Sequence, residues 1–73
     1  MRYAARVRVD CDDLGKRVSV RSRVVGGYSD VVGILETCDD GTFGVRDRRG
    51  ALRTIDRSVV VAAKVVAQPP RRR

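Results

Sequence analysis

Valine residues alternate with charged residues along much of this chain, and that alternation predicts β-strands. The pattern is clearest over residues 16–25, where Val18, Val20 and Val24 fall on one face and arginines with a serine fall on the other. Side chains of a strand point alternately to the two faces of a sheet. We therefore expect this strand to bury its valines and to expose its arginines.

Further extended segments follow, separated by residues typical of turns. The expected strands cover residues 31–38, 42–47, 51–55 and 59–66, with a weaker alternation over residues 2–10. The expected turns and loops cover residues 11–15, 26–30, 39–41 and 48–50, where glycine or aspartate recurs. Residues 56–58 are typical of a single 3₁₀ turn. This order predicts a meander of short antiparallel strands.

Two of the expected strands contain residues that are unusual for a strand. Gly33 interrupts the alternation of its strand, and an isolated glycine there indicates a bulge or sharp bend, which would let one strand serve both halves of a closed sheet. Residues 59–66 could form a short helix, because Ala63 and Lys64 are good helix formers. The many β-branched residues favour a strand.

These elements predict an all-β fold: a small barrel of about five short, strongly bent antiparallel strands with one 3₁₀ turn before the last strand. The barrel is expected over residues 14–67, after an N-terminal arm of residues 1–13 that could add a strand. Residues 68–73 are expected to be a Pro/Arg linker or tail. The predicted core consists of Leu14, Val18, Val20, Val24, Val32, Leu35, Phe43, Val45, Ile55 and Val60.

Composition narrows the possible chemistry. The 73 residues suffice for one domain, and there is no histidine, which removes the commonest general base and metal ligand. Two cysteines are too few for a disulfide scaffold or a zinc site, and we interpret Cys11 and Cys38 as cytoplasmic thiols. A bond between them would need Cα atoms within about 7 Å, which the sequence does not reveal. No apolar run is long enough to span a membrane.

The net charge of +7 raises the question of a nucleic-acid partner. Arginine guanidinium groups suit phosphates, but carboxylates are interspersed among them, and only 4% of the residues are aromatic. A solvated charged surface is the simpler interpretation. Tyr28 is a lone aromatic candidate for peptide contact. The candidate contacts to nucleic acid or to a partner are Arg17, Arg21, Arg23, Arg46, Arg48, Arg49 and Tyr28.

Paired aspartates could bind a metal ion or exchange protons. Asp12, Asp13, Asp39 and Asp40 lie in turn sequences, where aspartate is favoured for bonding backbone amides. We therefore expect no metal site and no cofactor.

Four stretches, GKRVSVR (15–21), YSDVVGILE (28–36), TFGVRDRRG (42–50) and VVVAAKVV (59–66) before two prolines, carry a resemblance. They resemble the SH3-like barrel at the N-terminus of a group of actinobacterial GNAT-superfamily N-acetyltransferases, over roughly residues 14–70. The resemblance implies a non-catalytic SH3-like module ahead of an acetyl-CoA-dependent domain. Residues 23–28 (RVVGGY) come nearest to an acetyl-CoA pyrophosphate loop, but they end in tyrosine and lead into a strand, so we reject them.

Two functional hypotheses follow. The first is a non-enzymatic accessory domain whose partner is an adjacent acetyltransferase domain or another protein. The alternative is a small basic barrel that binds RNA or DNA through an arginine face. The oligomeric state and any acetyl acceptor stay open, and no membrane partner is expected.

Overall fold

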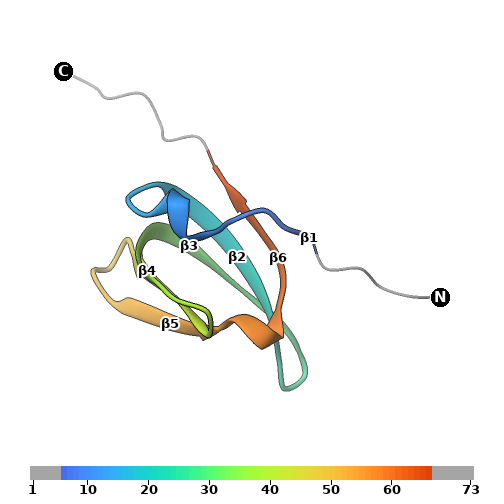
Figure 1. Cartoon of the computed structure of the whole chain (residues 1–73). Coiled ribbons are helices and arrows are strands. Elements are labelled where there is room, and N and C mark those ends of the chain that lie inside the picture. Colours follow the sequence, from blue (N-terminus) through green and yellow to red (C-terminus); the bar gives the residue numbers. More distant parts are fainter. Residues whose placement is uncertain (1–5, 67–73) are drawn as a thin grey trace.

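The computed structural model describes residues 6–66, which form one strongly curved sheet of six strands (Figure 1). The order across the sheet is β1-β6-β2-β3-β4-β5. The strands are β1 (Arg6–Val7), β2 (Arg17–Val24), β3 (Gly27–Cys38), β4 (Thr42–Asp47), β5 (Leu52–Asp56) and β6 (Val60–Val65). Two 3₁₀ helices, η1 (Cys11–Asp13) and η2 (Arg57–Val59), precede β2 and β6. The predicted all-β, barrel-like fold is confirmed.

Beyond the five strands of the predicted barrel, the sheet contains β1, which lies in the N-terminal arm where an additional strand was considered. All pairs are antiparallel except that of β1 with β6, where Arg6 faces Ala62 and Val7 faces Ala63. Arg8 continues the contact, since its amide donates to the Ala63 carbonyl at 2.8 Å. Most of residues 59–66 therefore form a strand, β6, and not a helix. This strand lies between β1 and β2.

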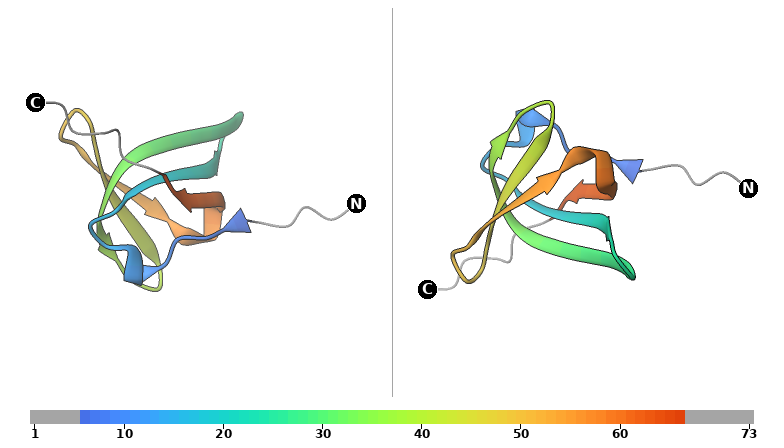
Figure 2. Two further views of the ribbon diagram at one scale, coloured as in Figure 1. Left: turned by 90° about the horizontal axis from the view of Figure 1, so that it is seen from above. Right: turned by 90° about the horizontal axis from the view of Figure 1, so that it is seen from below.

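The long strand β3 curls the sheet (Figure 2). Its first part pairs with β2 and its second part with β4, and Gly33 takes part in both pairings. A Cβ at Gly33 would overlap the Arg46 carbonyl oxygen of β4, so the strands approach too closely for any other residue. One strand therefore pairs with both halves of the closed sheet, as expected. The register shift between β3 and β4, however, lies between Leu35 and Thr37 and not at Gly33.

A tight hairpin joins β2 to β3. The last pair is Val24 with Gly27, which leaves Val25 and Gly26 as a two-residue turn. Gly26 has φ +86°, a backbone conformation that favours glycine. The flexible loop predicted over residues 26–30 is wrong, because β3 begins at Gly27.

The core lies between the inner faces of the curled sheet. Val18, Val20, Leu35, Phe43 and Val45 are fully buried. The remaining members of the buried cluster are Val9, Val31, Ile55, Val60 and Ala63. Seven of the ten proposed core residues therefore lie in the core.

The other three proposed core residues are exposed. Val24 is 45% exposed because it lies at the hairpin end, beyond Ser22, the last β2 residue paired with β6. Val32 is 41% exposed because Val31, opposite Val20, takes the inward position. Leu14 is 48% exposed at the end of η1, and the N-terminal arm buries Val9 instead.

Cys11 and Cys38 form a disulfide, with their Cα atoms 5.3 Å apart. The interpretation of these residues as free thiols is therefore wrong. The bond ties η1 to the end of β3 across 27 positions of sequence. Only the folding of the arm back over the sheet brings the two residues together, which no local pattern could reveal. In residues 6–66 no helix is long and apolar enough to cross a membrane. The proposed linker, residues 68–73, lies outside the described residues.

Candidate functional site

The outer face of β2 carries three of the candidate arginines, as the alternation predicted. Arg21 lies opposite Asp30 of β3 and binds it with two hydrogen bonds, of 2.8 and 3.1 Å. The hydrogen bond from Arg21 holds the pKa of the Asp30 carboxyl below its ordinary value. Both side chains are about half exposed, so the pair contributes little to stability. Arg17 and Arg23 have no ion pair among the described residues.

Tyr28 lies beside this pair near the hairpin end. The residue is 58% exposed, and the Arg21 guanidinium carbon lies 6.0 Å from the centroid of its ring. A single exposed ring packed against an arginine does not form an aromatic groove for a proline-rich peptide.

The candidate arginines near the β4–β5 turn differ from one another. Arg46 binds Glu36 through two hydrogen bonds and also donates to the Gly50 carbonyl oxygen. Its hydrogen bond holds the pKa of the Glu36 carboxyl below its ordinary value. Arg48 and Arg49 are exposed in the turn itself. Arg17, Arg46 and Arg48 line one shallow groove across β2, β3 and β4, together with the carboxylates of Asp30 and Asp47.

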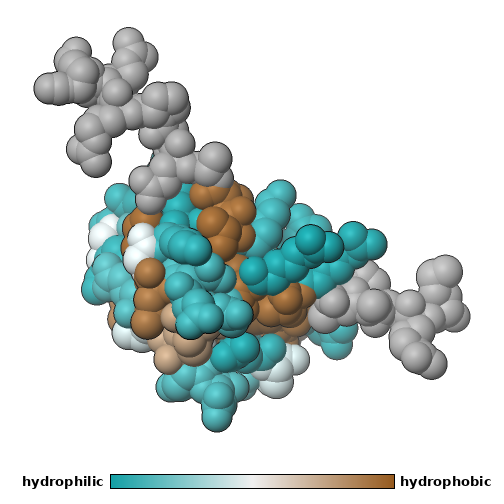
Figure 3. Space-filling view, turned by 45° about the horizontal axis from the view of Figure 1, so that its top comes forward, coloured by the Kyte–Doolittle hydropathy of each residue, from teal (hydrophilic) through white to brown (hydrophobic). Residues whose placement is uncertain are grey.

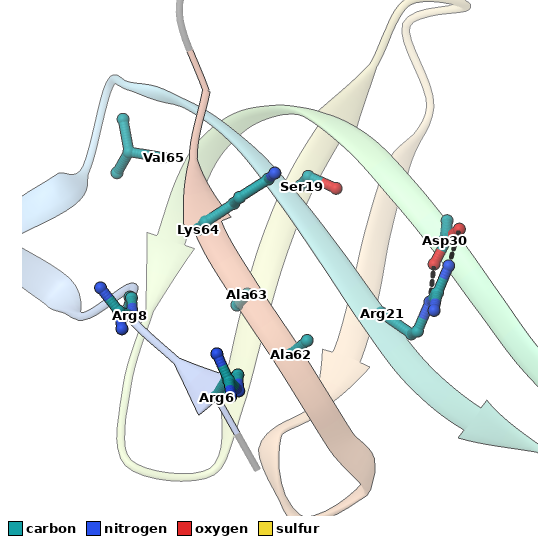
Figure 4. A pocket seen from close by; sticks show the side chains of 9 residues that line it. All are labelled: Arg6, Arg8, Ser19, Arg21, Asp30, Ala62, Ala63, Lys64 and Val65. Carbon is teal, nitrogen blue, oxygen red and sulfur yellow. Dashed lines mark hydrogen bonds and ion pairs between the residues drawn. The ribbon is translucent and has the colours of Figure 1, made fainter.

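A second open groove lies on the outer face of β1, β6 and β2 (Figure 4). Arg6, Arg8 and Lys64 line it with the Arg21–Asp30 pair, over a floor that includes Ala62 and Ser19. Apart from Arg21, sequence reasoning missed these cations. The alternation over residues 2–10 placed two arginines on a strand, but only the parallel pairing of β1 with β6 brings them to Lys64.

Two of the four aspartates singled out as metal candidates, Asp13 and Asp39, bond backbone amides in turns. Asp39 accepts hydrogen bonds from the amides of Gly41 and Thr42, each at 2.8 Å, and these bonds lower the pKa of its carboxyl. Asp13 accepts from the Asp10 amide and from Lys16 Nζ, and the pKa of its carboxyl is lowered for the same kind of reason. Within residues 6–66 no three His, Cys, Asp or Glu side chains gather as a metal site.

Arg57 of η2 holds three elements together beside the disulfide. Its guanidinium group lies 4.5 Å from the centroid of the Phe43 ring and donates to the Asp39 carbonyl oxygen at 2.6 Å. It also lies 3.9 Å from Cys38 Sγ. Arg57 was predicted only as part of a turn, because the sequence gives no sign that its side chain crosses to β4.

The fold and these surfaces define a small, barrel-like all-β domain with shallow, charged grooves. A family model described as the Rv0428c N-terminal Sm-like domain matches residues 12–64, and the chain therefore belongs to this family. The searches of curated proteins and of solved structures found no match.

Proposed function

We propose that this chain is a non-catalytic accessory domain that works beside an acetyl-CoA-dependent acetyltransferase domain. The observation that carries the proposal is the match of residues 12–64 to a family described as an N-terminal domain, which implies a further part in the protein that gives the family its name. The resemblance to the barrel that precedes GNAT catalytic domains supplies the kind of partner.

The chemistry of the side chains supports a binding role. The sequence contains no histidine, and both cysteine sulfurs are joined to each other, so a histidine-activated nucleophile cannot be assembled from this chain. The carboxylates with lowered pKa values bond turn amides, arginines or a lysine. A general acid or base would need a pKa nearer neutrality.

The test has two parts. Titration of acetyl-CoA into the 73-residue chain should give no binding heat, and an acetyl-transfer assay with the chain alone should give no product. The native polypeptide that carries this sequence, isolated from its source and measured by mass spectrometry, should contain or tightly hold an acetyl-CoA-dependent transferase activity. Acetyl-CoA binding by the chain alone, or a native protein without transferase activity, would contradict the proposal.

A second candidate function is nucleic-acid binding, favoured by the groove that brings Arg17, Arg46 and Arg48 together. Two features weaken it: Arg46 is already bound to Glu36, and two carboxylates line the same groove. Titration of a labelled single-stranded oligonucleotide at two salt concentrations tests it. Binding should weaken with salt by a logarithmic slope of about 0.7 per phosphate contacted. No binding at low salt excludes it.

The proposed compartment is the cytoplasm, and the disulfide provides its test. Disulfides are rare where glutathione and thioredoxin keep thiols reduced. If the protein works in the cytoplasm, rapid alkylation of intact cells followed by mass measurement should find Cys11 and Cys38 modified as thiols. A bonded pair in most molecules would indicate an oxidising compartment.

A further inference from the structure

The groove on the outer face of β1, β6 and β2 has more positive charge than its neighbours neutralise. Among the described residues, four cationic side chains line it, and the one carboxylate there, Asp30, is bound by Arg21. Arg6, Arg8 and Lys64 have no ion pair within the described part of the chain, and all three are exposed. A ligand can therefore contact these three cations without breaking an ion pair of the described chain.

The register of the strands sets the shape of the groove. Arg6, Ala62, Arg21 and Asp30 are successive partners across β1, β6, β2 and β3, so the small Ala62 lies between two arginines. In the next row Lys64 faces Ser19. Short side chains in the middle and long cations beside them leave a low floor with positive sides. The face in Figure 3 shows hydrophilic side chains beside small apolar areas.

The spacing of the cations suits an extended chain. Arg6 and Arg8 are two residues apart, and alternate residues of an extended segment lie about 6 to 7 Å apart on the same side. Figure 4 shows both guanidinium groups on the β1 side of β6, and Lys64 directed toward Ser19. Arg6 lies beside Ala62, whereas Arg8 and Lys64 lie near the next outward position of β6, on its two sides. A ligand that runs along β6 can therefore place one negative group near Arg6 and the next near Arg8 or Lys64.

We propose that this groove binds an extended acidic segment of a protein partner, whose alternate Asp or Glu side chains reach Arg6, Arg8 and Lys64. The proposal rests on the accessory role given above and names the chemistry of the partner. Carboxylates are favoured over nucleic acid because none of the described residues that line the groove is aromatic, so these residues offer bases no ring to stack on.

The probe is a fluorescein-labelled peptide of six residues in which Glu and Ala alternate. Binding to the full chain is measured by fluorescence anisotropy at low ionic strength, where exposed charges are least screened. The double variant Arg6→Gln with Lys64→Gln should weaken binding about tenfold, since each exposed ion pair contributes a few-fold. The same peptide with Gln in place of Glu should not bind.

A matched control removes the same charge elsewhere. Arg48→Gln with Arg49→Gln takes two cations from the β4–β5 turn and should change binding by less than about twofold. Circular dichroism must show that both variants are folded. In the unsubstituted chain the peptide should shift the backbone amide signals of Ala62 and Lys64 and leave those of Arg48 and Arg49 in place.

Three results would overturn the proposal. These are absence of peptide binding at low salt, equal weakening by the groove variant and the control, and tighter binding of a thymidine hexanucleotide than of the peptide. The last result would assign the groove to phosphates. None of them touches the accessory role itself, which is tested by acetyl transfer and the composition of the native protein.

Discussion

The two sides of this small sheet, one around β4 and β5 and the other around β1 and β6, differ in the ion pairing of their cations. Around β4 and β5, Arg46 binds Glu36 at 2.9 Å, and Arg53 lies 3.7 Å from Asp47. Around β1 and β6, Arg6, Arg8 and Lys64 have no such partner among residues 6–66. Both sides look alike in the sequence, where arginine recurs throughout. The pairing of individual cations, and not the density of arginine, therefore distinguishes the two sides.

Loss of the Cys11–Cys38 disulfide should destabilise the chain more than any other change considered below, and it should act first on the side of β1 and β6. For two cysteines 27 positions apart, Cys11→Ser with Cys38→Ser should cost about 3 to 4 kcal/mol of unfolding free energy, by the chain-entropy account. Urea unfolding of the oxidised chain and of the double variant measures it. The variant should also loosen β1, which within residues 6–66 pairs with β6 at two positions.

Amide hydrogen exchange locates that loosening. The Arg8 amide, bonded to Ala63, should lose protection well before the Asp47 amide, which bonds to Ala51 across the β4–β5 turn. If both amides lose protection together, the arm is not held by the disulfide, and the two sides unfold as one unit. Reduction of the unsubstituted chain should reproduce the effect of the double variant.

Gly33 gives the next largest effect, at the place where β3 passes from β2 to β4. A methyl group there would overlap the Arg46 carbonyl oxygen, and backbone cannot move aside as a side chain can. Gly33→Ala should cost about 2 to 3 kcal/mol, in the upper range for overpacking. Thermal unfolding measures it, and the curl of the sheet would no longer explain Gly33 if the variant were as stable as the parent.

Gly44→Ala is the matched control. Its methyl group would meet Thr37 Oγ1, which belongs to a side chain able to rotate. The cost should therefore be smaller than at Gly33, and Thr37→Ala in the same chain should relieve it. If Thr37→Ala gives no relief, the strain lies in the backbone of β4.

Strand positions could be predicted from the sequence because alternation is a local property. The inward face of β2 at Val18 and Val20 needs no knowledge of the rest of the chain. The failures at Val24 and Val32 have a different origin, because burial there depends on where β6 begins and on which valine of β3 faces Val20. Such facts are set by pairing between distant segments.

The candidate site was less predictable for the same reason. The cations of the groove come from both ends of the described chain, and the parallel pairing of β1 with β6 joins them. The Cys11–Cys38 bond and the position of Arg57 over Phe43 likewise join segments far apart in sequence. A single sequence contains no local signal for any of these contacts.

Arg57 offers a smaller test at the junction between the two sides. Arg57→Gln removes a cation from the face of the Phe43 ring and a charged donor from the Asp39 carbonyl oxygen. The loss should be about 1 to 2 kcal/mol, because the group is half-buried. Arg49→Gln, in the exposed β4–β5 turn, should change the free energy of unfolding by less than about 0.5 kcal/mol. Equal losses would show that Arg57 acts only through net charge.

Acid should have a modest effect on stability, and the effect should differ between the two sides of the sheet. Bonds from Arg46 to Glu36, from Gly41 to Asp39, from Ala51 to Asp47 and from Ser58 to Asp56 hold the pKa values of these carboxyls below their ordinary 4.5 for Glu and 3.8 for Asp. A carboxyl whose pKa is lowered by folding stabilises the folded state above the unfolded pKa. That stabilisation is lost as the pH falls through the folded pKa.

Stability should therefore be nearly constant from about pH 7 to pH 5 and should decline below about pH 4. Under mildly acidic conditions where the chain is still folded, the amides of Arg49 and Ala51, which bond Asp47, should lose protection before the Arg8 amide, which bonds a carbonyl. Residue-resolved amide exchange, corrected for the intrinsic pH dependence of exchange, measures the order. Because the groove around β6 contains one carboxylate and the β4–β5 side several, loss of protection at Arg8 first would show that charge pairing does not distinguish the two sides.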